Sequence, residues 1–224
     1  SWTMVHYEKV LLYAPGYIIN TFRFCILAII MCILIGVPIS WIMARTQMRT
    51  RGALDILTML VLALPGTALG IAYIRAFNTP ILLATPLANS WVILPIVLAV
   101  RRLPYTVRSS YSSLLVVHHS MEEAAESVGA GGLKTFKDIT LPLIWKGVLA
   151  GALFSFMTSI QESAATLLLS IPGWETMTMG IFTFYQGGTH GDAAALGSIL
   201  IVVGVITLFA VNRLSSVAQG GLFG

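Results

Sequence analysis

Charge is scarce in this sequence. Only 10% of its 224 residues are Asp, Glu, Lys or Arg, whereas a soluble domain carries about 25%. Hydrophobic residues make up 57%, the mean hydropathy is +0.87, and the apolar residues come in runs of about 20, the length that crosses a bilayer. The shortage of charge therefore indicates an integral membrane protein of several helices, rather than a soluble protein with an unusually apolar core.

Other shortages exclude further classes. The net charge of +4 comes from basic residues between apolar runs, so no nucleic-acid partner is expected. The only cysteines, Cys25 and Cys32, would lie about 10 Å apart on one helix, too far for a disulfide, and are predicted to be buried thiols. The adjacent pair His118 and His119 points in two directions and lacks companion ligands, so no metal site is predicted. No nucleophile–base–acid set indicates an enzyme.

The apolar runs predict an all-α, polytopic helix bundle of about five transmembrane helices. A moderately polar helix at 106–118 and an amphipathic, turn-rich interfacial segment at 170–192 lie between runs. The domain organisation is then a lead-in at 1–16, a transmembrane domain at 17–213 with a large loop at 119–142, and a tail at 214–224. The five predicted spans are 17–44, 54–74 (with a bend at Pro65 and Gly66), 81–103, 143–169 and 193–212.

The basic residues predict the orientation. If the link "RTQMRTRG" at 45–52 is cytoplasmic, ten of the thirteen Lys and Arg lie on or near the cytoplasmic side, as the positive-inside rule requires. Residue 1 is then outside and the C-terminus inside, and because no signal peptide is evident, an earlier membrane helix is expected before residue 1. The ten are Arg45, Arg49, Arg51, Arg101, Arg102, Arg108, Lys134, Lys137, Lys146 and Arg213; Lys9, Arg23 and Arg75 fall outside.

The stretch "EEAAESVGAGGLKTFKDITLP" at 122–142 is placed in the cytoplasm by this count. Its carboxylates suit the first turns of a helix, and Gly129 suits the turn that ends one. Leu133, Phe136 and Ile139 then recur at threes and predict one apolar stripe. The pattern predicts a helix–turn–helix that fits a groove on a cytoplasmic partner.

This stretch resembles the signature loop of ABC importer permeases, which reads E-A-A, three residues, G, nine residues, I-x-L-P. The resemblance implies a type I ABC importer permease fold, in which the loop is a coupling helix seated in a cleft of the ATP-binding subunit. An ordinary amphipathic loop that stabilises the bundle is the alternative. The residues expected to couple are Glu122, Glu123, Ala124, Ala125, Gly129, Ala130, Leu133, Phe136, Ile139, Leu141 and Pro142.

Two further stretches resemble the ferric-iron-type permeases: "ALDILTMLVLALPGTALGIAYIRAF" and "QESAATLLLSIPGWETMTMGIF". Ser163 and Ala164 depart from the Leu and Pro that follow the Glu in that pattern. The resemblance implies a bacterial inner-membrane importer, with ferric iron as the first substrate and thiamine, aminoethylphosphonate, sugar phosphate or polyamine as alternatives. It also implies a second permease subunit or fused half, an extracytoplasmic solute-binding protein, and a dimer of ATP-binding subunits that holds ATP and Mg.

The glycines of "GAGGLKT" do not form a phosphate-binding loop. Leu133 precedes Lys134, the glycine spacing is wrong and no strand precedes them. This chain is therefore expected to bind no cofactor. An ion-coupled secondary carrier would show an inverted repeat or several buried charges, and neither is evident; a non-transporting scaffold is a second rival.

Glu162 is a carboxylate deep inside the predicted fourth span, about 30 Å beyond Pro142 along the helix. Such a group is costly in a membrane and faces a cavity or a partner. Two interpretations stay open. Glu162 lines the substrate path together with Gln161, Ser163 and Thr166, or it is structural, capping a helix or pairing with Arg23 or Arg75.

Overall fold

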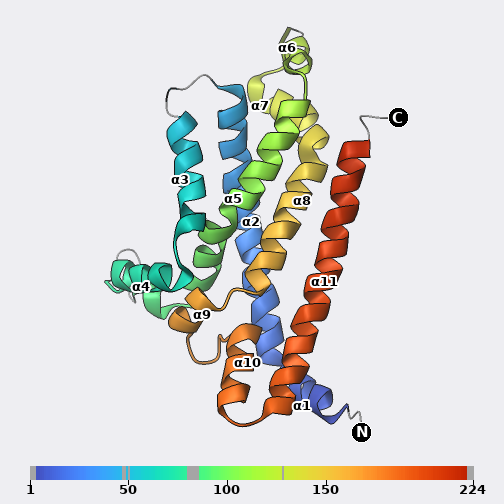
Figure 1. Ribbon diagram of the computed structural model, residues 1–224. Helices are drawn as coiled ribbons and strands as arrows, with labels where there is room; N and C mark the ends of the chain where they lie inside the picture. Colours follow the sequence, from blue (N-terminus) through green and yellow to red (C-terminus); the bar gives the residue numbers. More distant parts are fainter. Residues whose placement is uncertain (1–3, 47–48, 50, 80–85, 128, 221–224) are drawn as a thin grey trace.

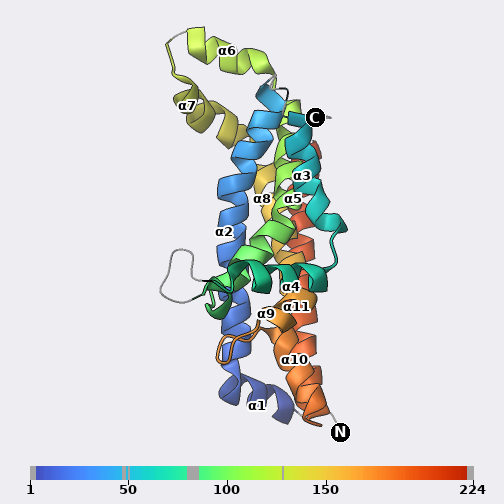
Figure 2. The same ribbon diagram turned by 90° about the vertical axis from the view of Figure 1, so that its left-hand side faces the viewer.

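A computed structural model describes residues 4–46, 49, 51–79, 86–127 and 129–220 of the chain. All regular elements in these ranges are helices. The long helices α2, α5, α8 and α11 run side by side, α3 follows the same direction, and α4 crosses them (Figures 1 and 2). The helices are α1 (Val5–Tyr13), α2 (Pro15–Arg45), α3 (Arg51–Ala63), α4 (Gly66–Phe77), α5 (Ile93–Val116), α6 (His119–Ser127), α7 (Gly132–Thr135), α8 (Leu141–Ile160), α9 (Ala164–Leu169), α10 (Met177–Gln186) and α11 (His190–Gly220), with a 3-10 turn η1 (Leu87–Asn89) and a π turn η2 (Phe136–Thr140).

Helix α2 is the centre of the bundle and packs on α5 and α8. It begins at Pro15, whose missing N–H costs nothing in a first turn. Phe24 and the thiols Cys25 and Cys32 have 1% or less of their surface exposed and lie in the main core with residues of α5. The prediction of buried free thiols is thus confirmed.

Helices α5 and α8 pack with their backbones close together. A Cβ on Gly151 would lie 2.6 Å from Ser109 Cβ and 3.1 Å from Thr106 Cα, and a Cβ on Gly147 would overlap Ser113 Oγ. Small residues at a helix contact allow this approach in membranes. The Ser109 hydroxyl uses the short distance to donate to the carbonyl of Gly147 at 2.7 Å.

Three helices are long and apolar enough to cross a membrane, or up to four if the bent pair α3–α4 counts as one span. The three are Pro15–Arg45, Gly132–Ile160 and His190–Arg213. Helix α5 has the length, at 24 residues, but contains Arg101, Arg102 and Arg108. The prediction of about five spans therefore approximates the architecture.

The predicted second span is broken by a bend of 108° between α3 and α4. Helix α3 ends before Leu64, because the residue before a proline disfavours the helical conformation, and Pro65 precedes α4 in an extended conformation. The sequence predicts a bend here, and this is confirmed. The bend is larger than expected for one continuous span, since α4 crosses the bundle instead of continuing along it (Figure 2).

The predicted third span, 81–103, is wrong. Residues 80–85 lie outside the described residues. The helix, α5, begins only at Ile93 and runs to Val116, so it includes most of the separate helix predicted at 106–118. Pro95 is its third residue, where the N–H has no intrahelical partner to lose. The predicted span ends too early because Arg101 and Arg102 resemble a membrane boundary in the sequence.

The predicted fourth span, 143–169, is also too long. Helix α8 ends at Ile160, and residues 164–169 form the separate helix α9. The amphipathic helix expected within 170–192 is α10, which turns back onto α11. No glycine or proline marks the end of α8, so the break depends on tertiary contacts of Glu162, described below.

The glycine contact between α5 and α8 gives a testable prediction. Gly151→Ala should destabilise the fold by about 1–3 kcal/mol, because its methyl group would overpack a fixed contact. Gly197→Ala in α11 is the matched control, since the nearest atom to a Cβ there is 3.9 Å away and alanine favours a helix. Thermal unfolding in detergent, followed by tryptophan fluorescence, should show a lower midpoint for Gly151→Ala only. Equal midpoints would contradict the close packing.

Candidate functional site

The loop at 119–142, called here the signature loop, extends beyond one end of the bundle (Figure 2). Helix α6 ends in a turn where Gly129 has φ of +89°, the left-handed region that favours glycine. The N–H of Ala130 bonds back to the carbonyl of Ala125 at 3.1 Å, as in a helix C-cap. The predicted helix–turn–helix is confirmed, with α7 and η2 forming its second arm.

The signature loop has an exposed face and an inner face. Glu123, Ala124 and Gly129 are exposed, and Leu133 has 83% of its surface exposed. Ala130, Ile139 and Leu141 are half-buried and Pro142 is exposed. Turned inward are Glu122 (5% exposed), Ala125, Thr135 and Thr140.

The predicted apolar stripe is divided between these two faces. Phe136 packs edge-on against Trp41 of α2, with ring centroids 6.1 Å apart, whereas Leu133 faces outward. The extra residue in the π turn changes the phase of the helix between α7 and α8. The stripe therefore does not form one continuous apolar face on the signature loop.

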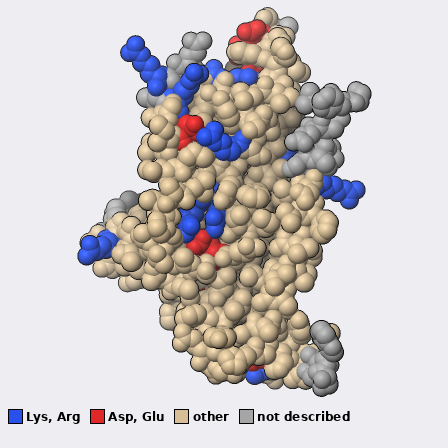
Figure 3. Space-filling view, viewed as in Figure 1, with Lys and Arg blue, Asp and Glu red and all other residues tan. Residues whose placement is uncertain are grey.

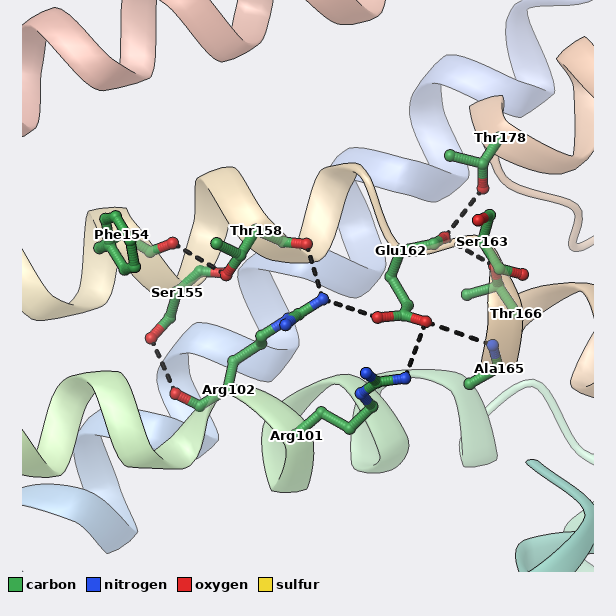
Figure 4. A network of polar contacts seen from close by, with 10 residues as sticks. All are labelled: Arg101, Arg102, Phe154, Ser155, Thr158, Glu162, Ser163, Ala165, Thr166 and Thr178. Atoms are coloured by element: carbon green, nitrogen blue, oxygen red, sulfur yellow. Dashed lines mark hydrogen bonds and ion pairs between the residues drawn. The ribbon is translucent and has the colours of Figure 1, made fainter. Parts of the chain in front are cut away.

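Glu162 follows the end of α8 and forms the second site, together with Arg101 and Arg102 of α5 (Figure 4). Its Oε1 lies 3.0 Å from Arg101 and its Oε2 2.6 Å from Arg102. The residue is 6% exposed, and the two arginine side chains are 15% and 12% exposed. Figure 3 shows basic and acidic atoms next to each other at mid-height on the surface, at the level of α4 and α9.

Two of these side chains, Arg102 and Glu162, also cap helix ends. Arg102 donates to the carbonyl of Thr158 at 2.9 Å, in the last turn of α8. Glu162 accepts from the N–H of Ala165 at 3.2 Å, in the first turn of α9. A cation at a helix C-terminus and an anion at an N-terminus are both favourable. These contacts explain why α8 ends here without a glycine or proline.

The main chain of Glu162 is held as well. Its carbonyl accepts from Thr166 Oγ1 at 2.7 Å and from Thr178 Oγ1 at 3.0 Å, which joins α9 and α10 to the cluster. Helix α4 also approaches closely, because a Cβ on Gly66 would overlap the guanidinium group of Arg101. The Glu162 cluster therefore connects α4, α5, α8, α9 and α10.

The predicted partners of Glu162 were wrong. It pairs with Arg101 and Arg102, not with Arg23 or Arg75. The count of basic residues predicts Arg101 and Arg102 at the cytoplasmic end, but α5 begins at Ile93 and they lie in its first half. Arg23 instead lies over the rings of Trp91 and Trp174, 5.9 and 5.5 Å from their centroids.

The four residues expected along a substrate path do not share one environment. Glu162 and Thr166 are buried, whereas Gln161 and Ser163 are exposed. The capping and pairing contacts fit the structural interpretation of Glu162, and the path role stays a prediction. Among the described residues, no group of three or more His, Cys, Asp or Glu is placed to hold a metal ion.

Comparison with known proteins shows the family. Residues 36–217 match the family described as "binding-protein-dependent transport system inner membrane component". The chain belongs to this family, as its signature loop predicted.

Relatives within the family carry different names. The chain is 32% identical over 186 residues to the ferric transport system permease protein FbpB of Actinobacillus pleuropneumoniae, covering 83% of this chain but only 27% of that protein. It is 32% identical over 193 residues to the molybdenum transport system permease protein ModB of Mycobacterium bovis, covering 82% and 73%. It is 27% identical over 191 residues to the sulfate transport system permease protein CysT of Salmonella typhimurium, covering 81% and 69%.

Solved structures show the fold. The inward-facing MetNI methionine ABC transporter matches with a TM-score of 0.71 at 15% identity, over 94% of this chain and 98% of that chain. A bacterial alginate ABC transporter in complex with its periplasmic protein matches with a TM-score of 0.69 at 16% identity, over 96% and 83%. The predicted fold, an all-α type I ABC importer permease, is confirmed.

The Glu162 cluster predicts a stability effect. Glu162→Gln leaves two guanidinium groups without their counter-charge and should cost about 3 kcal/mol, as for a broken buried pair. The exposed Glu123 offers the matched control, Glu123→Gln. Thermal unfolding of the purified variants should show a clearly lower midpoint for Glu162→Gln alone. An unchanged midpoint, together with impaired transport, would favour a path role instead.

Proposed function

We propose that this chain is the transmembrane subunit, or one half of a fused one, of a type I ABC importer. The observation that carries the proposal is the signature loop, which projects from the bundle with an exposed face around Gly129 and Leu133. Two such permease units form the substrate pathway, two ATP-binding subunits that hold ATP and Mg dock on the loops, and an extracytoplasmic solute-binding protein delivers the substrate. The chain itself has a transport role and no enzymatic one.

The positions of its charges support an orientation with the signature loop and the C-terminus in the cytoplasm. Arg23 and Arg45 lie about 33 Å apart along α2, and the 20 residues of α8 separate the signature loop from Glu162 by about 30 Å. Both lengths match the hydrocarbon core of a bilayer. With Arg101 and Arg102 moved to the outer side, eight of the thirteen Lys and Arg still fall on the cytoplasmic side (ten minus two), as the positive-inside rule requires.

Ferric iron is the first substrate that we propose, supported by the similarity to FbpB. An oxyanion is the second candidate. The Glu162 cluster has two guanidinium groups for one carboxylate, which favours anions over bare cations nearby, and relatives are named for sulfate and molybdenum transport. Thiamine, aminoethylphosphonate, sugar phosphates and polyamines stay as further alternatives.

Uptake into proteoliposomes tests this proposal. The full complex with its binding protein should accumulate radiolabelled ferric iron only when ATP is present on the side of the signature loop. ATP-dependent uptake of sulfate or molybdate without iron would keep the importer and replace the substrate. Uptake that ignores ATP would overturn the importer and favour an ion-coupled carrier.

The turn at Gly129 predicts an uncoupling variant. Gly129→Trp strains a left-handed residue and fills the open space in which a Cβ there meets no atom within 4 Å. Transport should fall by about tenfold or more while ATP hydrolysis continues, as expected for lost coupling between sites. Gly173→Trp is the matched control, with φ of +85° and open space, but far from the signature loop. Equal losses in both variants would indicate a folding defect.

A further inference from the structure

Glu122 differs from the rest of the signature loop because its carboxylate points into the protein. It is 5% exposed, whereas Glu123 beside it is exposed. Its Oε2 lies 2.8 Å from Arg45 Nε, and its Oε1 accepts a hydrogen bond from Thr140 Oγ1 at 2.7 Å. His119 Nδ1, one turn earlier, lies 3.2 Å from the same Oε2. A residue so enclosed presents nothing to a docking partner.

Arg45 carries this contact to the end of the bundle. It is the last residue of α2, and its side chain is 10% exposed. Its Nη2 donates a hydrogen bond of 2.8 Å to the carbonyl of Val117, the residue that follows α5. One carboxylate and one guanidinium group therefore join α2, α5, α6 and η2. The contact between Arg45 Nε and Glu122 is a close ion pair rather than an aligned hydrogen bond, and removal of one partner leaves a buried charge.

The position of Thr140 follows from the Ile-x-Leu-Pro part of the signature. Pro142 has no N–H, and in a regular α-helix its ring would collide with the carbonyl of Asp138. The chain instead forms a π turn, in which the N–H of Leu141 bonds to the carbonyl of Phe136. Thr140 lies within this turn, is fully buried, and directs its hydroxyl to Glu122.

We infer that Arg45, Glu122 and Thr140 are positioning residues that fasten the signature loop to α2 and α8, so that a displacement of the loop moves these helices as one rigid body. The inference rests on the proposed function. It gives Glu122 an internal role, distinct from the docking contact expected from its place in the signature, and it gives the proline of the signature a structural reason.

Glu122→Gln and Thr140→Val remove the charge and the hydroxyl while keeping side-chain size. Glu8→Gln, at an exposed position on α1 outside the signature loop, is the control. The complexes should still assemble with the ATP-binding subunits and hydrolyse ATP. Ferric iron accumulated per ATP hydrolysed should fall about tenfold in Glu122→Gln, the scale of a lost hydrogen bond to a charged group, and should stay unchanged in the control. The charge-reversed pair Arg45→Glu with Glu122→Arg should recover part of the ratio, which a general folding defect would not allow.

A distance measurement tests rigidity without any substrate. Spin labels at Glu126→Cys on α6 and Leu34→Cys on α2 occupy exposed positions, while Cys25 and Cys32 are 1% exposed and protected from labelling. In the otherwise unaltered complex, the distance within the chain should stay narrow and constant when nucleotide is trapped with vanadate. With Glu122→Gln, the distribution should broaden or shift by about one helical turn, roughly 5 Å.

The outcomes distinguish a failure of the proposed importer function from a failure of the inference about Arg45, Glu122 and Thr140. A chain that does not assemble with ATP-binding subunits overturns the proposed function, and the inference with it. A complex that couples normally while its loop-to-α2 distance shifts on trapping overturns the inference alone. So does Glu122→Gln, if its coupling ratio and its distance distribution both match those of the control.

Discussion

The pairing of charge within an apolar bundle is the constraint on which the rest of this structure depends. A charged group among apolar helices is costly unless it is paired, and this chain has few charges to place. Glu162 satisfies the constraint for Arg101 and Arg102, and in doing so it ends α8, starts α9 and holds α10. If this cluster were replaced by apolar residues, nothing in the local sequence would define the break between α8 and α9.

Glu122 and Arg45 satisfy the same constraint at the other end of α8. Between the two charge clusters, α8 packs on α5 through Gly147 and Gly151, with too little space for a larger residue. Interiors packed in this way transmit displacements rather than absorb them. The two clusters and the glycine contact together form a continuous structural element of about 30 Å, which runs from the signature loop to the segments around Glu162.

Features coded by neighbouring residues could be predicted from the sequence. The long apolar run predicts α2, and the spacing of glycine and proline predicts the signature loop with its turn at Gly129. Features that depend on distant partners could not. The continuation of α5 beyond residue 103 could not be predicted, because Arg101 and Arg102 resemble a membrane boundary until Glu162, 60 residues after Arg102, is known to pair with them. Likewise, the pattern gives Glu122 and Glu123 the same weight, and only the packing of α2 shows that one faces inward.

Residues that hold the helices together must be distinguished from residues that contact the substrate. The fold is similar to that of the MetNI transporter at 15% identity, so it tolerates wide change in sequence. The relatives FbpB, ModB and CysT differ in the substrate they are named for and yet align over more than 80% of this chain. A residue that holds helices together, as Glu162 does, is needed for the fold whatever the substrate is. A loss of uptake on changing Glu162 therefore identifies a substrate contact only if the stability of the bundle is unchanged.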